Sequence, residues 1–159
     1  MPVSNNYGKT KTMWPFNGEI DIMEAKGRFT TQTSSAVHYA TSSGSHTYKS
    51  NWYGTDVLGS NFSITGWHVY AVEWCEDRMD FYVDDIKTLT VTRSTWHTSY
   101  YNDYSTASPF DQPFYIILNL AVGGQFDNGL TPDSSFTQAT MEVDYVRVYQ
   151  YYEILNHPQ

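Results

Sequence analysis

Three acidic side chains, Glu19, Asp21 and Glu24, crowd into the short run WPFNGEIDIMEAKGR. Successive side chains of a β-strand point to opposite faces, so Glu19 and Asp21 share one face and the isoleucines beside them share the other. Neighbouring carboxylates split their pKa values, because the charge on one raises the pKa of the next. One ionised and one protonated carboxyl group together can do nucleophilic and acid/base chemistry, such as the cleavage of a glycosidic bond.

Glu24 breaks the alternation, because a regular strand would turn this carboxylate toward the core at a high cost in free energy. We therefore expect a β-bulge near Ile22-Met23 that returns Glu24 to the face of Glu19 and Asp21. The Cα atoms of Glu19 and Glu24 then lie about 13 Å apart at ~3.3 Å per step. Their side chains can reach the ~5–5.5 Å of a retaining glycosidase, although the ~6.5–9.5 Å of an inverting one stays open. A merely structural acidic face is the weaker interpretation, because like charges along it are destabilising.

Composition excludes several classes of partner for this chain of 159 residues, whose length fits one domain. The net charge is −8 and the pI is about 4.8, which argues against nucleic acid and anionic membranes as partners. The sequence has no apolar run long enough to span a membrane and no leader at its start. A single cysteine, Cys75, excludes an intrachain disulfide and a zinc cluster, and its apolar surroundings predict a core position.

Short runs of alternating apolar and polar residues predict an all-β protein, an antiparallel β-sandwich of jelly-roll type. MDFYVDD and KTLTVTR predict a hairpin that turns at Asp84-Asp85. TSSGSHTYKSNWYGTD reads as a turn-rich stretch, and Ser94–Pro113 as a long loop. The predicted strands are Glu19–Glu24, Ala36–Ala40, His68–Trp74, Met79–Val83, Thr88–Thr92, Phe114–Val122 and Thr140–Tyr149.

Five blocks of the chain resemble, in order, glycoside hydrolase family 16, and in particular its laminarinase-like endo-β-1,3-glucanases with a concanavalin-like jelly roll. The blocks are WPFNGEIDIMEAKGR, AVHY, WHVYAVEW with MDFYVDD, PFYIILNLAVGGQF and MEVDYVRVY. They cover about residues 13–150. The two residues between Asp21 and Glu24 resemble this bulged subgroup, since lichenase-like members carry one.

The resemblance implies a role for each matching residue. Glu19 would be the nucleophile, Glu24 the general acid and then base, and Asp21 a neighbour that sets the protonation of the nucleophile. Trp14 would stack under the sugar beside the scissile bond, and His38 would tune the pKa of Glu24. The expected substrate contacts are Trp14, Met23, His38, Gln125 and Phe126, the last two at the rim of the cleft.

The resemblance also carries expectations about metal, location and completeness. It implies no cofactor for catalysis. Asp144 matches a position that often binds a structural calcium ion in this family, and a solvated carboxylate at a strand end is the equal alternative. It places the protein outside the cell or in the periplasm. Relatives carry further strands before the region of Trp14, so we expect residues 1–159 to be one catalytic domain that lacks its N-terminal part. After His38-Tyr39 the chain has Ala40-Thr41 where relatives have glycines, which predicts a reshaped cleft.

Three functions remain open on the sequence alone. The first is retaining endo-hydrolysis of a β-glucan, with β-1,3-glucan as the polysaccharide partner. The second is hydrolysis of another polysaccharide by the same motif, such as mixed-linkage glucan, agarose or carrageenan. The third is a non-catalytic β-glucan-binding protein, which the intact Glu19 and Glu24 disfavour.

Overall fold

The computed structural model describes residues 14–41, 43–96 and 109–151. The chain divides into two compact units, Met1–Ile117 and Leu118–Gln159. The expectation of a single catalytic domain over residues 1–159 stays a prediction. No helix within the described ranges is long and apolar enough to cross a lipid bilayer.

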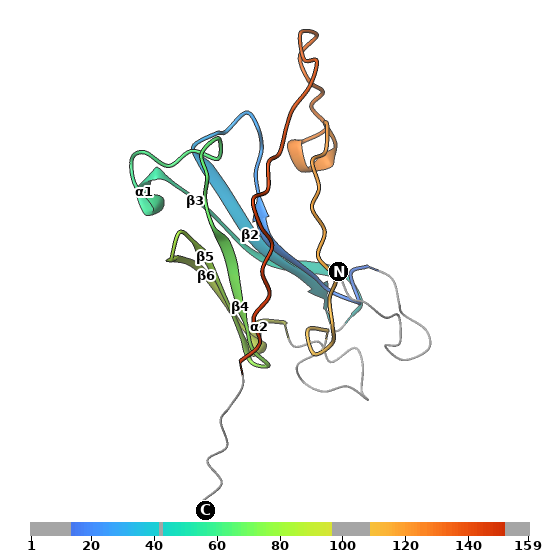
Figure 1. Ribbon diagram of the computed structural model, residues 1–159. Coiled ribbons are helices and arrows are strands. Elements are labelled where there is room, and N and C mark those ends of the chain that lie inside the picture. Colours follow the sequence, from blue (N-terminus) through green and yellow to red (C-terminus); the bar gives the residue numbers. More distant parts are fainter. Residues whose placement is uncertain (1–13, 42, 97–108, 152–159) are drawn as a thin grey trace, which may run out of the picture. The chain divides into compact units, whose positions relative to one another are not determined.

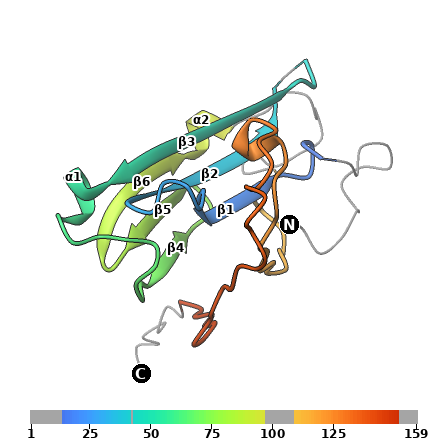
Figure 2. The same cartoon turned by 90° about the horizontal axis from the view of Figure 1, so that it is seen from above.

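The first unit is built from two antiparallel sheets of three strands each, in the orders β1-β2-β3 and β4-β5-β6 (Figure 1). Two short helices, α1 (Thr55–Leu58) and α2 (Arg93–Trp96), follow β3 and β6. Figure 2 shows α1 directly at the end of β3. The all-β prediction is therefore confirmed. The strands are β1 (Glu19–Glu24), β2 (Gln32–Ala40), β3 (His46–Gly54), β4 (Tyr70–Trp74), β5 (Arg78–Val83) and β6 (Ile86–Thr92).

The two sheets pack face to face around one main hydrophobic core. Val37 and Tyr39 of β2 meet Met79 and Phe81 of β5 in this core, and all four side chains are buried. Apolar side chains at every second position of these strands reach the same layer because the side-chain period of a strand is two. The opposite face of β1-β2-β3 is left to polar and aromatic side chains. The remaining members of the core are Leu89, Val91, Trp96 and Phe110.

The predicted hairpin at Asp84-Asp85 is present. Val83 pairs with Ile86, and the two aspartates between them have positive φ angles of 48° and 67°. Positive φ at both central residues defines a type I′ turn, whose twist matches that of the strands it joins. The alternating pattern on either side therefore predicted both the strands and their connection.

Three sequence-based expectations are wrong. The stretch read as turn-rich contains β3, a strand whose outward face is polar or aromatic and therefore lacks apolar alternation. Cys75 is exposed in the turn after β4, where its amide donates to the carbonyl of Arg78, because the strand ends at Trp74. Within the described residues 109–151, Phe114–Val122 and Thr140–Tyr149 are not strands. Alternation reports which face a side chain takes, whereas a strand also needs a hydrogen-bonded neighbour.

The second unit contains one short element among its described residues, the 3₁₀ helix η1 (Gln125–Asp127). Gly123 and Gly124 precede it with positive φ angles of 68° and 102°, which glycine adopts without steric cost. Of the predicted loop Ser94–Pro113, residues 97–108 lie outside the described part of the chain.

Candidate active site

A β-bulge interrupts the pairing of β1 with β2, at the place predicted from the sequence. Asp21 pairs with Ala36 and Glu24 pairs with Ser34, so two residues of β1 face the single residue Ser35. The extra residue shifts the alternation by one position. Glu24 therefore returns to the face of Glu19 and Asp21, as predicted.

Buried hydroxyl groups of β2 hold the bulge in place. The hydroxyl of Thr33 donates to the carbonyl of Glu24 at 2.8 Å, and that of Ser35 donates to the carbonyl of Ile22 at 2.9 Å. The Ser35 hydroxyl also lies 2.5 Å from the Tyr53 hydroxyl. Both β2 side chains are buried. Their hydroxyl groups donate to carbonyl groups that have no regular partner where the bulge disrupts the β1–β2 hydrogen bonds. This requirement explains the polar run Thr-Ser-Ser in a strand that faces the core.

Glu19 is bound to the indole of Trp14. Nε1 of Trp14 donates to Oε2 of Glu19 at 2.6 Å. Burial, and then the charge of Asp21, raise the pKa of Glu19, while this hydrogen bond acts in the opposite direction because it favours the ionised carboxylate. Trp14, the residue expected to stack under the sugar, is thus in contact with the predicted nucleophile and is 45% exposed.

Asp21 faces His38 across the β1–β2 pair. Oδ2 of Asp21 lies 3.2 Å from Nε2 of His38, an ion pair whose alignment falls short of a hydrogen bond. Burial lowers the pKa of His38, but close contact with Asp21 and its negative charge outweigh this effect and raise the pKa overall. His38 therefore lies beside Asp21 and carries a proton more readily than an ordinary histidine.

Glu24 has a more strongly shifted pKa than Glu19. Burial, and then the charge of Asp21, raise its pKa to about 7. Ser34 makes a long hydrogen bond of 3.4 Å to Oε2 of Glu24, which opposes the shift only weakly. A carboxyl group with a pKa near 7 can hold a proton at neutral pH and release it to a substrate.

A cluster of aromatic rings extends from Trp14 onto β3, the strand that the sequence did not reveal. His46 lies between Trp14 and Tyr48, with ring centroids 4.4 and 5.8 Å away. Its Nε2 is 2.8 Å from Nδ1 of His38. Burial, and then the positive charge of His38, lower the pKa of His46. A neutral His46 can accept a hydrogen bond from the N–H of His38. His46 therefore connects His38, which contacts Asp21, with Trp14, which binds Glu19.

The sequence contained one signal for this cluster. His46, Tyr48, Ser50 and Trp52 recur at every second position, and β3 pairs them with the residues of β2 that lie beside β1. The ring-bearing residues thus share the sheet face of the carboxylates. Alternation of aromatic with polar residues, rather than apolar with polar residues, marks this strand.

Comparison with known proteins decides the family. The model of the family described as "Glycosyl hydrolases family 16" matches residues 3–147, and so confirms the resemblance seen in the sequence. The chain belongs to this family. Its site can therefore be considered beside those of other family 16 proteins.

Three relatives of this family 16 chain, two of them curated proteins and one a solved structure, are glucanases by name. The glucan endo-1,3-beta-glucosidase A1 of Niallia circulans is 40% identical over 94% of the chain and 21% of its own length. The beta-glucanase of Rhodothermus marinus is 35% identical over 96% of the chain and 51% of its own length. The endo-beta-1,3-glucanase structure from Pyrococcus furiosus matches with a TM-score of 0.56 and 32% identity, over 77% of this chain and 43% of that one. This family 16 chain thus spans about half or less of these relatives.

The remaining residues that this family 16 chain was predicted to use for substrate or calcium binding lie in two different units. Met23 lies on the bulge and is 37% exposed. Gln125, Phe126 and Asp144 belong to the second unit. Their expected contacts with substrate, and with calcium for Asp144, stay predictions.

One group of side chains in the first unit has the composition of a metal site. Glu19, Asp21 and His38 each offer a ligand atom, and these atoms lie within 4.8 Å of one another. Two carboxylates and one imidazole are too few oxygens for calcium, which takes six to eight. In the arrangement described above, the three side chains are engaged with Trp14 and with one another, which suits acid/base chemistry without a metal ion.

Proposed function

We propose that this chain hydrolyses internal β-1,3 bonds of a β-glucan with net retention at the anomeric carbon, using Glu19 as nucleophile and Glu24 as acid and base. One observation carries the proposal. Glu19 and Glu24 lie on the same face of the bulged strand β1 but have different surroundings. The Trp14 N–H favours an ionised Glu19, whereas burial brings the pKa of Glu24 to about 7.

In the first step, Glu24 donates its proton to the glycosidic oxygen as the bond from that oxygen to the anomeric carbon breaks. An oxygen of Glu19 forms a new bond to this carbon, giving a glycosyl-enzyme ester. The shortened chain on the other side leaves as an alcohol. Glu24 is now a carboxylate and Glu19 carries the sugar.

In the second step, a water molecule attacks the anomeric carbon and gives a proton to the Glu24 carboxylate. The ester bond breaks and returns Glu19 to its ionised form. One water molecule is consumed for each bond cleaved. Two inversions at the same carbon leave the configuration unchanged.

Asp21 and His38 position and tune the two glutamates. The charge of Asp21 raises the pKa of both neighbours, most usefully that of Glu24, which must hold a proton. His38 balances part of this charge across the 3.2 Å contact with Asp21.

The proposed substrate class rests on the relatives, because the catalytic motif alone does not discriminate among polysaccharides. The relatives from Niallia circulans and Pyrococcus furiosus are named as acting on 1,3-β-glucan. Mixed-linkage glucan, agarose and carrageenan are the alternatives within the same chemistry. The non-enzymatic alternative is a protein that binds β-glucan without cleaving it. We propose an extracellular or periplasmic location, as the resemblance implies.

Reducing-sugar release from laminarin, lichenan, agarose and carrageenan, assayed side by side, tests the substrate. We expect laminarin to be cleaved fastest, and proton NMR of the early products to show the β-anomer first. Initial appearance of the α-anomer would contradict retention. Binding to laminarin without release of reducing ends would favour the non-catalytic alternative.

Azide rescue separates the roles of the two glutamates on an activated aryl β-glycoside. In Glu24→Ala, azide should intercept the glycosyl-enzyme and give a β-glycosyl azide. In Glu19→Ala, azide should attack the substrate directly and give the α-glycosyl azide. The reverse pattern would exchange the two roles.

A further inference from the structure

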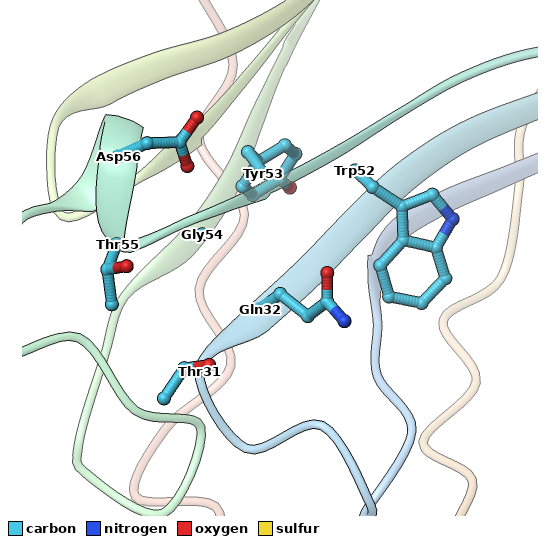
Figure 3. A pocket seen from close by; sticks show the side chains of 7 residues that line it. All are labelled: Thr31, Gln32, Trp52, Tyr53, Gly54, Thr55 and Asp56. Carbon is cyan, nitrogen blue, oxygen red and sulfur yellow. The ribbon is translucent and has the colours of Figure 1, made fainter.

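A hollow of about 390 Å³ lies at the junction of β2, β3 and α1 (Figure 3). Its lining contains none of the three carboxylates of β1. In Figure 3 the indole of Trp52 stands at one end, and the side chains of α1 stand at the other. The lining residues are Thr31, Gln32, Trp52, Tyr53, Gly54, Thr55 and Asp56.

The lining combines one flat aromatic face with several short polar groups. Trp52 is 39% exposed, and the ammonium of Lys26 lies 5.5 Å from the centroid of its ring. Figure 3 shows the Gln32 amide near the indole, and the Asp56 carboxylate adds acceptors at the other end of the hollow. An indole packs against the apolar face of a sugar ring, and amides and carboxylates bind its hydroxyl groups.

Gly54 lets the end of β3 approach the Thr31 backbone closely at the wall of the hollow. A Cβ atom at this position would lie 2.9 Å from the carbonyl oxygen of Thr31, closer than such atoms approach in proteins, and 3.7 Å from Oδ1 of Asp56. No other residue type fits there without moving the backbone of Thr31. This wall of the hollow therefore depends on glycine at position 54.

The strand register places this hollow beyond the acid/base end of the site. Ser34 pairs with Glu24 on one side and with Trp52 on the other, so the three residues form one row across the sheet. Two strand spacings separate Glu24 from Trp52, or about 10 Å at ~4.8 Å each. The next row contains Gln32 and Gly54, which line the hollow. A chain molecule that crosses the sheet from Glu24 can thus reach Trp52.

We propose that Trp52, with Gln32 and Asp56, forms a saccharide-binding subsite for a sugar unit of the same polysaccharide, remote from the bond that is cleaved. The sugar ring stacks on the indole, and its hydroxyl groups bind the amide and the carboxylate. The Asp56 carboxylate and the Lys26 ammonium over the indole offset each other in charge, so the proposed ligand is a neutral glucan. This subsite rests on the proposed function for its substrate class, but its binding does not require catalysis.

The first test measures binding without turnover. Affinity electrophoresis in gels that contain laminarin compares Glu19→Gln with the double variant Glu19→Gln/Trp52→Ala. Retardation by laminarin should weaken by about threefold to tenfold in apparent dissociation constant, as expected for one lost aromatic contact. Glu19→Gln/Trp67→Ala is the matched control, because Trp67 is 68% exposed and does not line the hollow.

The second test measures turnover in the otherwise unchanged chain. Trp52→Ala should raise KM for laminarin more than it lowers kcat, and the loss should shrink as the substrate becomes shorter. Trp52→Tyr keeps a flat ring and should recover most of the affinity, which excludes a folding defect as the cause. Gln32→Ala should weaken laminarin binding in the same direction.

The outcomes separate this subsite from the proposed function. Retardation of Trp52→Ala and Trp67→Ala to the same extent would overturn the subsite even if the wild type hydrolyses laminarin. Weaker retardation in Trp52→Ala alone would support the subsite even if no glucan is hydrolysed, and the proposed function would then fail by itself. Stronger binding of a sulfated galactan than of laminarin would overturn the assignment of a neutral glucan.

Discussion

Asp80 on β5 and Glu24 on β1 are both carboxyl groups set into a sheet, yet their surroundings shift their pKa values in opposite directions. Burial would raise the pKa of Asp80, but hydrogen bonds from Thr90 and Lys87 and the charge of Arg78 lower it overall. The contact distances of the Thr90 hydroxyl, Lys87 ammonium and Arg78 guanidinium are 2.5, 3.0 and 2.9 Å. Around Glu24, burial and the negative charge of Asp21 raise the pKa.

The difference separates a structural carboxylate from a reactive one. Asp80 is held ionised by cations and a hydroxyl, so it contributes to stability and has no proton to give at neutral pH. Glu24 lies beside another carboxylate, which keeps its proton available for transfer. A set of like charges on one strand face is destabilising by itself, and the proposed catalysis accounts for its presence in β1.

Removing either glutamate should have the largest effect. Glu24→Gln should lower kcat on laminarin by roughly 10²–10⁴-fold, the contribution of a positioned acid or base. Glu19→Gln should lower it at least as much, because no glycosyl-enzyme ester can form. Circular dichroism should stay that of the wild type, because an amide of the same shape relieves repulsion with Asp21. Glu76→Gln is the control, since its exposed pair with Arg93 contributes little. Turnover near that of the wild type in either site variant would remove that residue from the mechanism.

The pH dependence should follow from the same asymmetry. Glu24 must be protonated for the first step, so kcat/KM should fall about tenfold per pH unit above its pKa of about 7. Glu19 must be ionised, and its raised pKa should move the acid limb above the 4.5 of an ordinary glutamate. A profile of kcat/KM between pH 4 and 9 measures both limbs. An alkaline limb that persists in Glu24→Gln would assign it to another group.

Folding stability should respond to pH with opposite signs at the two carboxyl groups. The raised pKa of Glu24 contributes stability that is present below the unfolded pKa and is lost as pH rises toward about 7. The lowered pKa of Asp80 contributes stability that is present above its unfolded value and is lost on acidification. Thermal melts of Glu24→Gln and Asp80→Asn across this range should each lose one of the two dependences. Parallel curves for both variants would contradict the comparison.

Removing the hydrogen bond between Trp14 and Glu19 should lower the rate less than removing either glutamate. Trp14→Phe keeps an aromatic ring beside His46 but removes the N–H donor. A hydrogen bond to a charged group contributes about 1.5–3 kcal/mol, and partial exposure favours the lower end, so kcat/KM should fall about tenfold. The acid limb should also move to higher pH. An unchanged acid limb would show that this bond does not set the ionisation of Glu19.

Asp80→Asn should have the smallest effect on activity. Its side chain lies on a different sheet from the site, so kcat/KM should stay within about twofold of the wild type. The loss of charge beside Lys87 and Arg78 should lower the free energy of unfolding by about 1–3 kcal/mol, measured by urea denaturation. A large loss of activity without loss of stability would break the distinction between the two carboxyl groups.

The sequence by itself determined the chemistry of β1 and its local geometry. Spacing alone predicted that Glu24 rejoins Glu19 and Asp21 through a bulge, because a strand has a period of two and a buried carboxylate is costly. The hairpin at Asp84-Asp85 followed from equally local rules. These predictions succeeded because each depends on residues that are neighbours in the chain.

Only the tertiary structure decided what surrounds the carboxylates. β3 carries His46, Tyr48 and Trp52, and its place beside β2 depends on sheet order and register, which are contacts between residues far apart in the chain. The contact of Trp14 with His46 likewise exists only once β1 and β3 flank β2. Side-chain alternation assigns each residue to one face of a sheet. Which strands pair decides the neighbours of that residue on the face, and these neighbours set the pKa of a titratable side chain.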